Sequence, residues 1–314
     1  MESAFTFPGQ GSQVVGMGKV LAEQFLAARM VFEEVDDALG EKLSQIIFEG
    51  PADTLTLTAN AQPALMAVSI AIIRVMEELG LNIKSKVKFV AGHSLGEYSA
   101  LCAAGAFSLA DTAKLLRIRG NAMQSAVAVG EGSMAALIGL DEKDVEEICT
   151  TVLEEGVCQI ANDNGGGQIV ISGQTKAIEK AVQIASGKGA KRAIILPVSA
   201  PFHSSLMQPA AEVMKDALFC VNKVAPTIPL VANVSVTPES DPERIVTLLV
   251  HQVTGRVRWR EIIEWMSTSG VNRLFEVGSG KVLTGLARRI NKDINGLTVN
   301  TAEEIEEALR VLGV

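Results

Sequence analysis

The sequence predicts an α/β protein in which helices cover a largely parallel sheet, with a smaller ferredoxin-like α+β subdomain inserted into it. The first observation is composition. Of 314 residues, 48% are hydrophobic but only 4% aromatic, as is usual for helices that cover a parallel sheet. The second is the alternation of short apolar runs, glycine-rich turns and helical periodicity. The third is a segment over residues 127–198 whose predicted elements run β-α-β-β-α-β.

The predicted core starts with a buried strand over residues 4–7, which ends at Pro8 and enters a glycine-rich turn at residues 9–12. Apolar residues over 65–79 recur at spacings of three and four, which predicts a helix. The apolar run over 87–91 predicts a central strand. After the insertion, strands are expected over 229–233, 273–277 and 297–300, and a capping box of Thr301 with Glu304 is expected to open the last helix.

The inserted segment can bury a small core of its own. Its strands are predicted over 134–140, 157–161, 168–172 and 193–198, and its helices over 142–155 and 176–186. We therefore expect a catalytic core made of residues 1–126 and 199–314, and a ferredoxin-like subdomain made of residues 127–198.

Charge and cysteine content exclude several classes of function. A net charge of −8 argues against nucleic-acid binding, because phosphate contacts need clustered positive charge. The four cysteines form no CxxC pair, so neither a zinc site nor a disulfide framework is expected. Arg74 interrupts the most apolar helical stretch, so no membrane span is expected. We expect a cytoplasmic monomer that needs no metal or other cofactor.

The motif Gly92-His93-Ser94-Leu95-Gly96 lies between a predicted strand and a predicted helix. Glycines two positions on either side of a serine let a strand turn sharply into a helix and hold the hydroxyl exposed. Ser94 is therefore the candidate nucleophile. The alternative is a serine that only caps a helix at a tight turn.

A serine hydroxyl needs a base to take its proton, and the chain has three histidines. His93 is adjacent to Ser94 on the turn, where successive side chains diverge, so we expect it to pack or hydrogen-bond locally. His203 lies on a loop between Phe202 and Ser204, and active-site residues favour such loops. His251 could equally be a histidine at a helix end. The residues alone favour His203 and leave His251 open.

Attack on a carbonyl also requires two N–H donors for the oxygen that becomes negative. One is the amide of Leu95, the residue after the nucleophile. The second could come from the glycine-rich turn at residues 9–11, whose amides should lie near the same sheet edge. That turn could also serve only to reverse the chain.

Several motifs together resemble the malonyl-CoA:acyl carrier protein transacylases, the acyltransferases of bacterial type II fatty-acid synthesis. The resemblance extends along essentially the whole chain. It is carried by Phe7-Pro8-Gly9-Gln10-Gly11-Ser12-Gln13, Gly92-His93-Ser94-Leu95-Gly96-Glu97, Arg117-Ile118-Arg119-Gly120, Asn162 before a glycine turn, Ala200-Pro201-Phe202-His203 and Glu276-Val277-Gly278-Ser279-Gly280. Ser279 stands where proline is common in relatives. The family implies a hydrolase-like core with the inserted subdomain.

The resemblance also implies roles for individual residues. Ser94 would be the nucleophile and His203 the base, without a carboxylate partner, because the Gln252 carbonyl would orient the imidazole. The amides of Gln10 and Leu95 would form the oxyanion hole. The remaining implied site residues are Arg119 as the ligand of the malonyl carboxylate, Asn162 in the cleft, and Phe202 as a residue of malonyl-selective members. The alternative for Phe202 is a role in packing alone.

Arg119 suits this role chemically, because a guanidinium offers a carboxylate two parallel hydrogen bonds. Ser108 and Asp111 can cap the helix that carries Arg117 and Arg119. Two arginines two positions apart point to nearly opposite helix faces, so we expect a structural or surface role for Arg117.

The expected reaction is ping-pong transfer of malonyl from coenzyme A through a Ser94 ester to the phosphopantetheine thiol of acyl carrier protein, feeding fatty-acid synthesis. The alternatives are a serine thioesterase or esterase, a malonyl loader for polyketide synthesis, and a catalytically silent module that only binds carrier protein or coenzyme A. Carrier proteins are typically acidic, so we expect one of two basic clusters to dock them. The clusters are Lys188, Lys191 and Arg192, and Arg256, Arg258 and Arg260.

Overall fold

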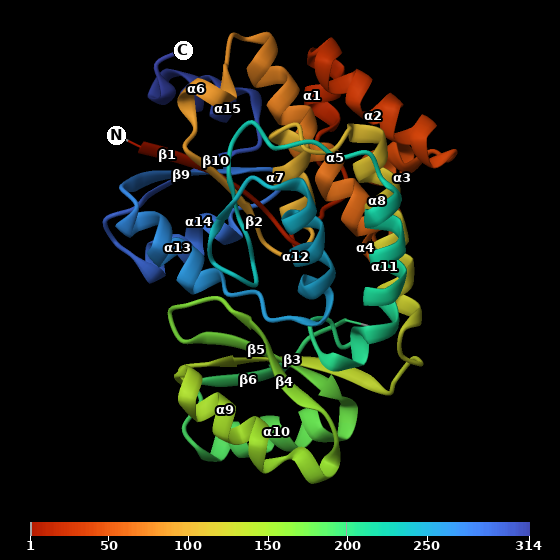
Figure 1. Ribbon diagram of the computed structural model, residues 1–314, viewed down its shortest axis with the longest axis vertical. Helices are drawn as coiled ribbons and strands as arrows, with labels where there is room; N and C mark the ends of the chain where they lie inside the picture. Colours follow the sequence, from red (N-terminus) through yellow and green to blue (C-terminus); the bar gives the residue numbers. More distant parts are fainter. Residues whose placement is uncertain (1, 199) are drawn as a thin grey trace.

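Two separate β-sheets organise the chain in the computed structural model, which describes residues 2–198 and 200–314 (Figure 1). The larger sheet has the strand order β10-β9-β1-β2-β7-β8 and is parallel except for the pair β7 and β8. Its strands are β1 (Glu2–Phe7), β2 (Phe89–Gly92), β7 (Leu230–Val231), β8 (Pro238–Glu239), β9 (Val271–Val277) and β10 (Asn295–Val299).

Alternate residues of the central strands enter two different cores, as the period of two in a strand requires. Phe5 and Phe7 of β1 pack into the larger core, whereas Ala4 packs into a smaller one on the opposite face. The smaller core is covered by α13 (Trp259–Thr268) and α14 (Val282–Ile290). Helices therefore cover both faces of the main sheet.

The larger core is built around α5 (Thr58–Glu78), whose residues are mostly buried. By length and composition α5 could cross a membrane, but its position inside the protein accounts for its apolar sequence. Other helices of this part are α1 (Lys19–Gln24), α2 (Leu26–Leu39), α3 (Leu43–Glu49), α4 (Ala52–Thr56), α6 (Ile83–Lys86), α7 (Gly96–Ala103), α8 (Leu109–Ser125), α11 (Gln208–Cys220), α12 (Pro242–Thr254) and α15 (Ala302–Leu312).

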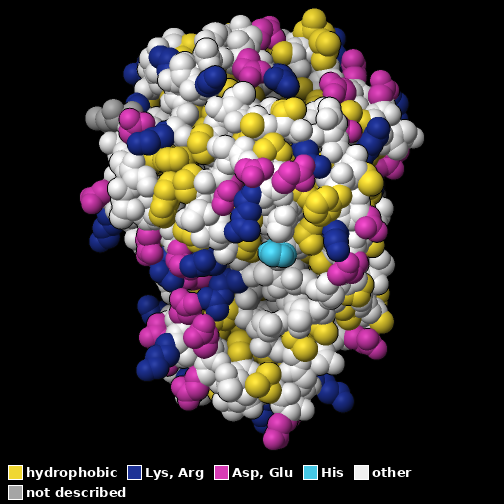
Figure 2. All heavy atoms as spheres, viewed as in Figure 1, with side chains coloured by type: hydrophobic (Ala, Val, Ile, Leu, Met, Phe, Trp, Pro, Cys, Tyr) yellow, Lys and Arg dark blue, Asp and Glu magenta, His cyan; other side chains and the backbone are white. Residues whose placement is uncertain are grey.

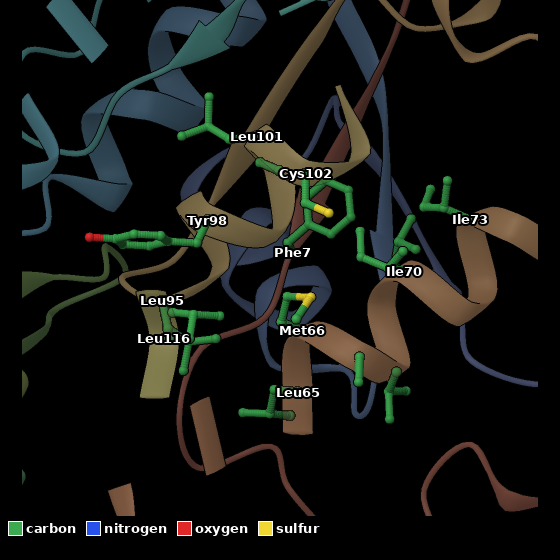
Figure 3. Close-up of a cluster of buried hydrophobic side chains, with 14 of the residues drawn as sticks. Phe7, Leu65, Met66, Ile70, Ile73, Leu95, Tyr98, Leu101, Cys102 and Leu116 are labelled. Carbon is green, nitrogen blue, oxygen red and sulfur yellow. The ribbon is translucent and has the colours of Figure 1, made fainter. Parts of the chain in front are cut away.

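Buried side chains of β1, α5 and α8 pack with those of α7 and its N-cap residue Leu95 (Figure 3). Phe7 of β1 lies next to Cys102 of α7 and above Met66 of α5, and Leu95 lies next to Leu116 of α8. Tyr98 points away from this cluster, with its hydroxyl at the outer end. The helix that follows the predicted nucleophile is thus fixed by buried packing on its inner face.

The second sheet is antiparallel, with the order β4-β5-β3-β6, and lies at the lower end of the molecule in Figure 1. Its elements follow in the order β3 (Gly132–Ile138), α9 (Glu142–Thr151), β4 (Cys158–Asp163), β5 (Gln168–Gln174), α10 (Thr175–Gly187) and β6 (Arg192–Ile195). This is the ferredoxin-like arrangement. The predicted fold class is confirmed.

The two faces of this second sheet have different neighbours. Ala135 and Leu137 of β3 pack beneath α9 and α10, whereas Met134 and Ala136 join the larger core. A parallel bridge between Asn162 and Val257 also joins the subdomain to the main body. The subdomain therefore packs against the main body through one face of its sheet.

Three predicted elements are shorter than expected by two or more residues. The helix expected over 142–155 ends at Thr151 and continues as a 3₁₀ turn, Leu153–Glu155. The strand expected over 193–198 ends at Ile195, two residues before Pro197, and the strand expected over 229–233 keeps only two residues. A second short 3₁₀ turn, Ser205–Met207, precedes α11. The domain boundaries at 126/127 and 198/199 stay a prediction, and Met1 and Ser199 lie outside the described residues.

Candidate active site

Ser94 occupies the sharp turn between β2 and α7, with a φ of 53°, in the left-handed region that non-glycine residues rarely adopt. The flanking glycines are required by close backbone approaches. A Cβ on Gly92 would lie 1.9 Å from the carbonyl carbon of Gly96, and a Cβ on Gly96 would lie 2.2 Å from the carbonyl oxygen of Phe7. The Ser94 amide donates to Oδ1 of Asn233 at 2.9 Å, which holds the turn. The sequence motif therefore forms the expected nucleophile turn.

His203 also has a positive φ, of 58°, and its Nε2 lies 2.7 Å from Oγ of Ser94. Its Nδ1 lies 2.9 Å from the carbonyl oxygen of Gln252 and 3.1 Å from that of Gly255. Carbonyl oxygens only accept hydrogen bonds, so Nδ1 must carry the proton. Nε2 is then the acceptor for the Ser94 hydroxyl, as a general base requires.

Burial and the nearby positive charge of Arg119 lower the pKa of His203 to about 3. The imidazole is therefore neutral at physiological pH, and its Nε2 is free to accept a proton. His93 is partly buried, and desolvation lowers its pKa. Its Nε2 lies 2.8 Å from Oδ1 of Asn164, and its ring packs on Trp259 with the centroids 5.5 Å apart. His93 thus packs and hydrogen-bonds, but its partner Asn164 is 71 residues away in sequence and not local as expected.

Arg119 is 1% exposed, and its guanidinium points toward the nucleophile. Nη2 donates to Oγ of Ser94 at 3.2 Å and to Oε1 of Gln252 at 2.9 Å, and Nη1 donates to Oε1 of Gln62 at 2.8 Å. The guanidinium carbon lies 5.6 Å from the centroid of the Tyr98 ring. Within residues 2–198 and 200–314, Arg119 has no direct ion pair and its Nε has no hydrogen-bond partner. A buried cation in a cleft without a paired anion is suited to a carboxylate ligand.

Arg117, two residues earlier on α8, has a different environment. It donates to the carbonyl oxygen of Ala59 and pairs with Glu41. Ser108 caps the helix by accepting from the amide of Asp111. These contacts agree with the expected structural role of Arg117.

The two predicted oxyanion-hole amides, those of Gln10 and Leu95, belong to residues that line the same cleft as Ser94. Across the described part of the chain, neither amide donates to another group. Unpaired amides beside a nucleophile can receive the charge that develops on a carbonyl oxygen.

The cleft has a volume of about 450 Å³ and lies between the core and the subdomain. Its apolar lining includes Met123, Met134 and Leu196. Seven of the eight predicted site residues line it, namely Gln10, Ser94, Leu95, Arg119, Asn162, Phe202 and His203. Gln252, the eighth, lies behind them and contacts both His203 and Arg119. His251 lies at the C-terminal end of α12, exposed and outside the cleft lining.

Three polar residues of the site were not predicted. Gln62 holds Arg119, and Asn233 holds the Ser94 turn. Glu97, buried in the first turn of α7, accepts from Nε2 of Gln252 at 2.6 Å. Glu97 had a signal in the sequence, because a carboxylate directly after the nucleophile motif is unusual in an apolar stretch. No sequence pattern around Gln62 or Asn233 indicated a role in the site. No group of three or more potential metal ligands occurs among the residues described.

Comparison with known proteins places this site in a family. A model of the acyl transferase domain matches residues 4–290. The chain is 47% identical to the malonyl CoA-acyl carrier protein transacylase of Bacillus subtilis, over 98% of this chain and 96% of the relative.

Solved structures agree with the sequence comparisons. The acyl-carrier-protein S-malonyltransferase of Bartonella henselae is 82% identical, covers all of both chains and superposes with a TM-score of 0.99. A type II PKS acyl-carrier protein in complex with its malonyl-transacylase supplies a third match, 40% identical, with a TM-score of 0.96 over 99% of this chain and all of that chain. The chain therefore belongs to the acyltransferase family of the malonyl-CoA:acyl carrier protein transacylases.

Proposed function

We propose that this chain transfers malonyl from malonyl-CoA to the phosphopantetheine thiol of acyl carrier protein, through an ester on Ser94. The observation that carries the proposal is the buried guanidinium of Arg119, which lies 3.2 Å from the Ser94 hydroxyl and has no paired anion among the described residues. The names of the relatives support the same substrates.

In the first half-reaction, Nε2 of His203 takes the proton of the Ser94 hydroxyl as Oγ attacks the thioester carbonyl carbon. The amides of Leu95 and Gln10 receive the negative charge on the carbonyl oxygen. The carbon–sulfur bond then breaks, and the proton on His203 passes to the leaving thiolate sulfur, which gives free coenzyme A thiol. The malonyl group is left as an ester on Ser94.

In the second half-reaction, His203 takes the proton of the phosphopantetheine thiol, and the sulfur attacks the ester carbonyl. The ester bond breaks, and Ser94 Oγ recovers its proton from His203. The Nδ1 contacts with the carbonyls of Gln252 and Gly255 keep the same tautomer ready in both steps.

Arg119 accounts for the choice of acyl group. The malonyl carboxylate would pair with the guanidinium, while an acetyl group would leave that charge buried and unpaired. The carboxylate would also offset the charge that lowers the pKa of His203, so the base would be strengthened when the correct substrate is bound. Asn162 and Phe202 would complete the cleft around the acyl group.

The carrier protein would approach the cleft from solvent and dock on a basic surface. Arg256, Arg258 and Arg260 are poor candidates, since each already pairs with carboxylates of the chain. On the face shown in Figure 2, basic and acidic side chains intermingle where the subdomain meets the core. The remaining candidate is the cluster of Lys188, Lys191 and Arg192, in which Lys188 pairs with Glu147.

We further propose a cytoplasmic monomer that uses no cofactor and serves fatty-acid synthesis. The match to a type II PKS acyl-carrier protein in complex with its malonyl-transacylase favours polyketide loading as the second candidate. A thioesterase would use the same serine and histidine but pass the acyl group to water.

Assays of the purified protein with and without holo carrier protein separate transfer from hydrolysis. We expect one equivalent of coenzyme A to be released quickly and further release to require the carrier thiol. Sustained loss of malonyl-CoA without that thiol would contradict a transferase.

Reversing the charges of Lys191 and Arg192 should raise the KM for carrier protein and leave the release of coenzyme A from malonyl-CoA unchanged.

A further inference from the structure

Glu97 is a buried carboxyl group that the two half-reactions do not use. Its side chain is 1% exposed and lies three residues after the nucleophile, in the first turn of α7. Oε2 accepts from Nε2 of Gln252 at 2.6 Å, and Oε1 accepts from the amide of Asn233 at 3.4 Å. A buried carboxylate is costly unless its contacts compensate for the lost water. The two partners, Gln252 and Asn233, both hydrogen-bond the backbone of Ser94.

The carboxamide of Gln252 is the link between Glu97 and the cation. Its Nε2 donates to Glu97 and to the carbonyl oxygen of Ser94, the latter at 2.8 Å. Its Oε1 accepts from Nη2 of Arg119 at 2.9 Å. The opposite amide orientation would place an N–H₂ group against the guanidinium, which only donates, and an oxygen against two acceptors. Glu97 and the Ser94 carbonyl together therefore favour the orientation in which Gln252 presents an acceptor to Arg119, and Glu97 makes the shorter of the two contacts.

Arg119 has few other restraints on its direction. Gln62 holds Nη1, and the Ser94 hydroxyl accepts from Nη2 at 3.2 Å. That hydroxyl becomes part of an ester during the reaction, so its contact cannot be constant. Neither Arg119 nor Gln252 changes covalently in the two half-reactions, so the chemistry does not require the hydrogen bond between them to break.

We propose that Glu97 is a positioning residue that orients the Arg119 guanidinium through the Gln252 carboxamide and so sets the preference for an acyl group with a free carboxylate. The inference rests on the carboxylate-binding role proposed for Arg119. Glu97 touches no reacting atom. Its effect should therefore appear in the discrimination between malonyl and acetyl groups, whereas a merely structural role would weaken the reaction of both substrates alike.

The variants Glu97→Ala and Glu97→Gln test this proposal, with Ser99→Ala as the matched control. Ser99 lies on the same helix, is 1% exposed, and its hydroxyl has no partner among the residues described. Glu97→Ala removes the acceptor. Glu97→Gln retains one side-chain oxygen, which can still accept from Gln252 and keep the amide orientation. For each protein, kcat and KM for coenzyme A release are measured with malonyl-CoA and with acetyl-CoA, and thermal unfolding is recorded.

In Glu97→Ala we expect the ratio of malonyl to acetyl kcat/KM to fall about ten- to a hundredfold, mainly through the KM for malonyl-CoA. Glu97→Gln should keep that ratio within about threefold of the unaltered chain, and Ser99→Ala should not change it. Equal losses for the two substrates in Glu97→Ala, or an unchanged ratio, would overturn the proposal. So would a ratio in Glu97→Gln as low as in Glu97→Ala.

Gln252→Ala keeps the test decisive if Glu97→Ala does not fold, because it removes the carboxamide but leaves the carbonyl that holds His203. We expect it to lower the ratio about ten- to a hundredfold, the range expected for Glu97→Ala. An unchanged ratio in Gln252→Ala would overturn the proposal. Arg119→Ala, measured in parallel, distinguishes a failure of the role proposed for Arg119 from a failure of the role proposed for Glu97. A retained malonyl preference in that variant would refute the role of Arg119 itself, while loss only in Arg119→Ala would refute the role of Glu97 alone.

Discussion

Replacing Arg119 by alanine should convert a malonyl-selective site into one that no longer distinguishes malonyl from acetyl groups. The guanidinium is 1% exposed and has no ion pair within the described residues, so the substrate carboxylate would be its main anionic partner. Removing one member of a buried charge pair costs about 3–5 kcal/mol. The kcat/KM for malonyl-CoA should therefore fall by roughly a hundred- to a few thousandfold.

Acetyl-CoA supplies the internal reference for this prediction. It has no carboxylate to lose, so its kcat/KM in Arg119→Ala should stay within about tenfold of the unaltered value. The assay is the release of coenzyme A thiol with each substrate, together with thermal unfolding. Arg117→Ala is the matched control, because Arg117 lies on the same helix and contacts Ala59 and Glu41 instead of the nucleophile. We expect that variant to lose some stability but to keep its malonyl preference.

Equal losses for malonyl-CoA and acetyl-CoA in Arg119→Ala would refute this reasoning. They would show that the guanidinium supports the geometry of Ser94, to which it donates a hydrogen bond, and does not recognise the acyl group. An unchanged kcat/KM for malonyl-CoA would refute it more simply.

Three further predictions follow from the site. Burial and Arg119 lower the pKa of His203 to about 3, with His93 and Glu97 also in the site, so the titration of His203 should contribute no inflection to kcat/KM for malonyl-CoA at the usual imidazole pKa. Burial raises the pKa of Glu97 to about 7, so an inflection of kcat/KM near that pH should disappear in Glu97→Gln. An inflection near pH 6.5 that persists in this variant would contradict a neutral His203. Gly96→Ala should lower the free energy of unfolding by about 1–3 kcal/mol or more, because a Cβ at position 96 would lie 2.2 Å from the Phe7 carbonyl oxygen. The same change should abolish formation of the malonyl ester on Ser94. His251→Ala should leave both half-reactions unchanged in the same assays, and a loss of transfer would reopen the choice of base.

The features that the sequence predicted well are those encoded locally. The nucleophile turn could be found from five consecutive residues, because glycine is needed at both flanking positions for steric reasons. The inserted subdomain could be found from the order and period of its elements. The capping roles of Ser108 and Thr301 followed from their spacing, although Glu304 bonds the amide of Asn300 instead of that of Thr301.

The features that escaped prediction depend on contacts between distant segments. Gln62 and Arg119 are 57 residues apart, and Asn233 and Ser94 are 139 residues apart. No local sequence pattern predicts such a hydrogen bond, because any polar residue on a buried face could make one. The strand expected over 229–233 kept only Leu230 and Val231, since the chain turns there to place Asn233 beneath the nucleophile. Tertiary contacts thus overrode local propensity in the region that builds the site.

The account depends most directly on an acyl ester at Ser94, and intact mass spectrometry can detect it. The protein is mixed with malonyl-CoA without carrier protein, and the adduct is located by peptide mapping. We expect one malonyl group on Ser94, its loss when holo carrier protein is added, and no adduct in Ser94→Ala. An adduct that persists in Ser94→Ala, or the absence of any adduct on the unaltered chain, would contradict the mechanism.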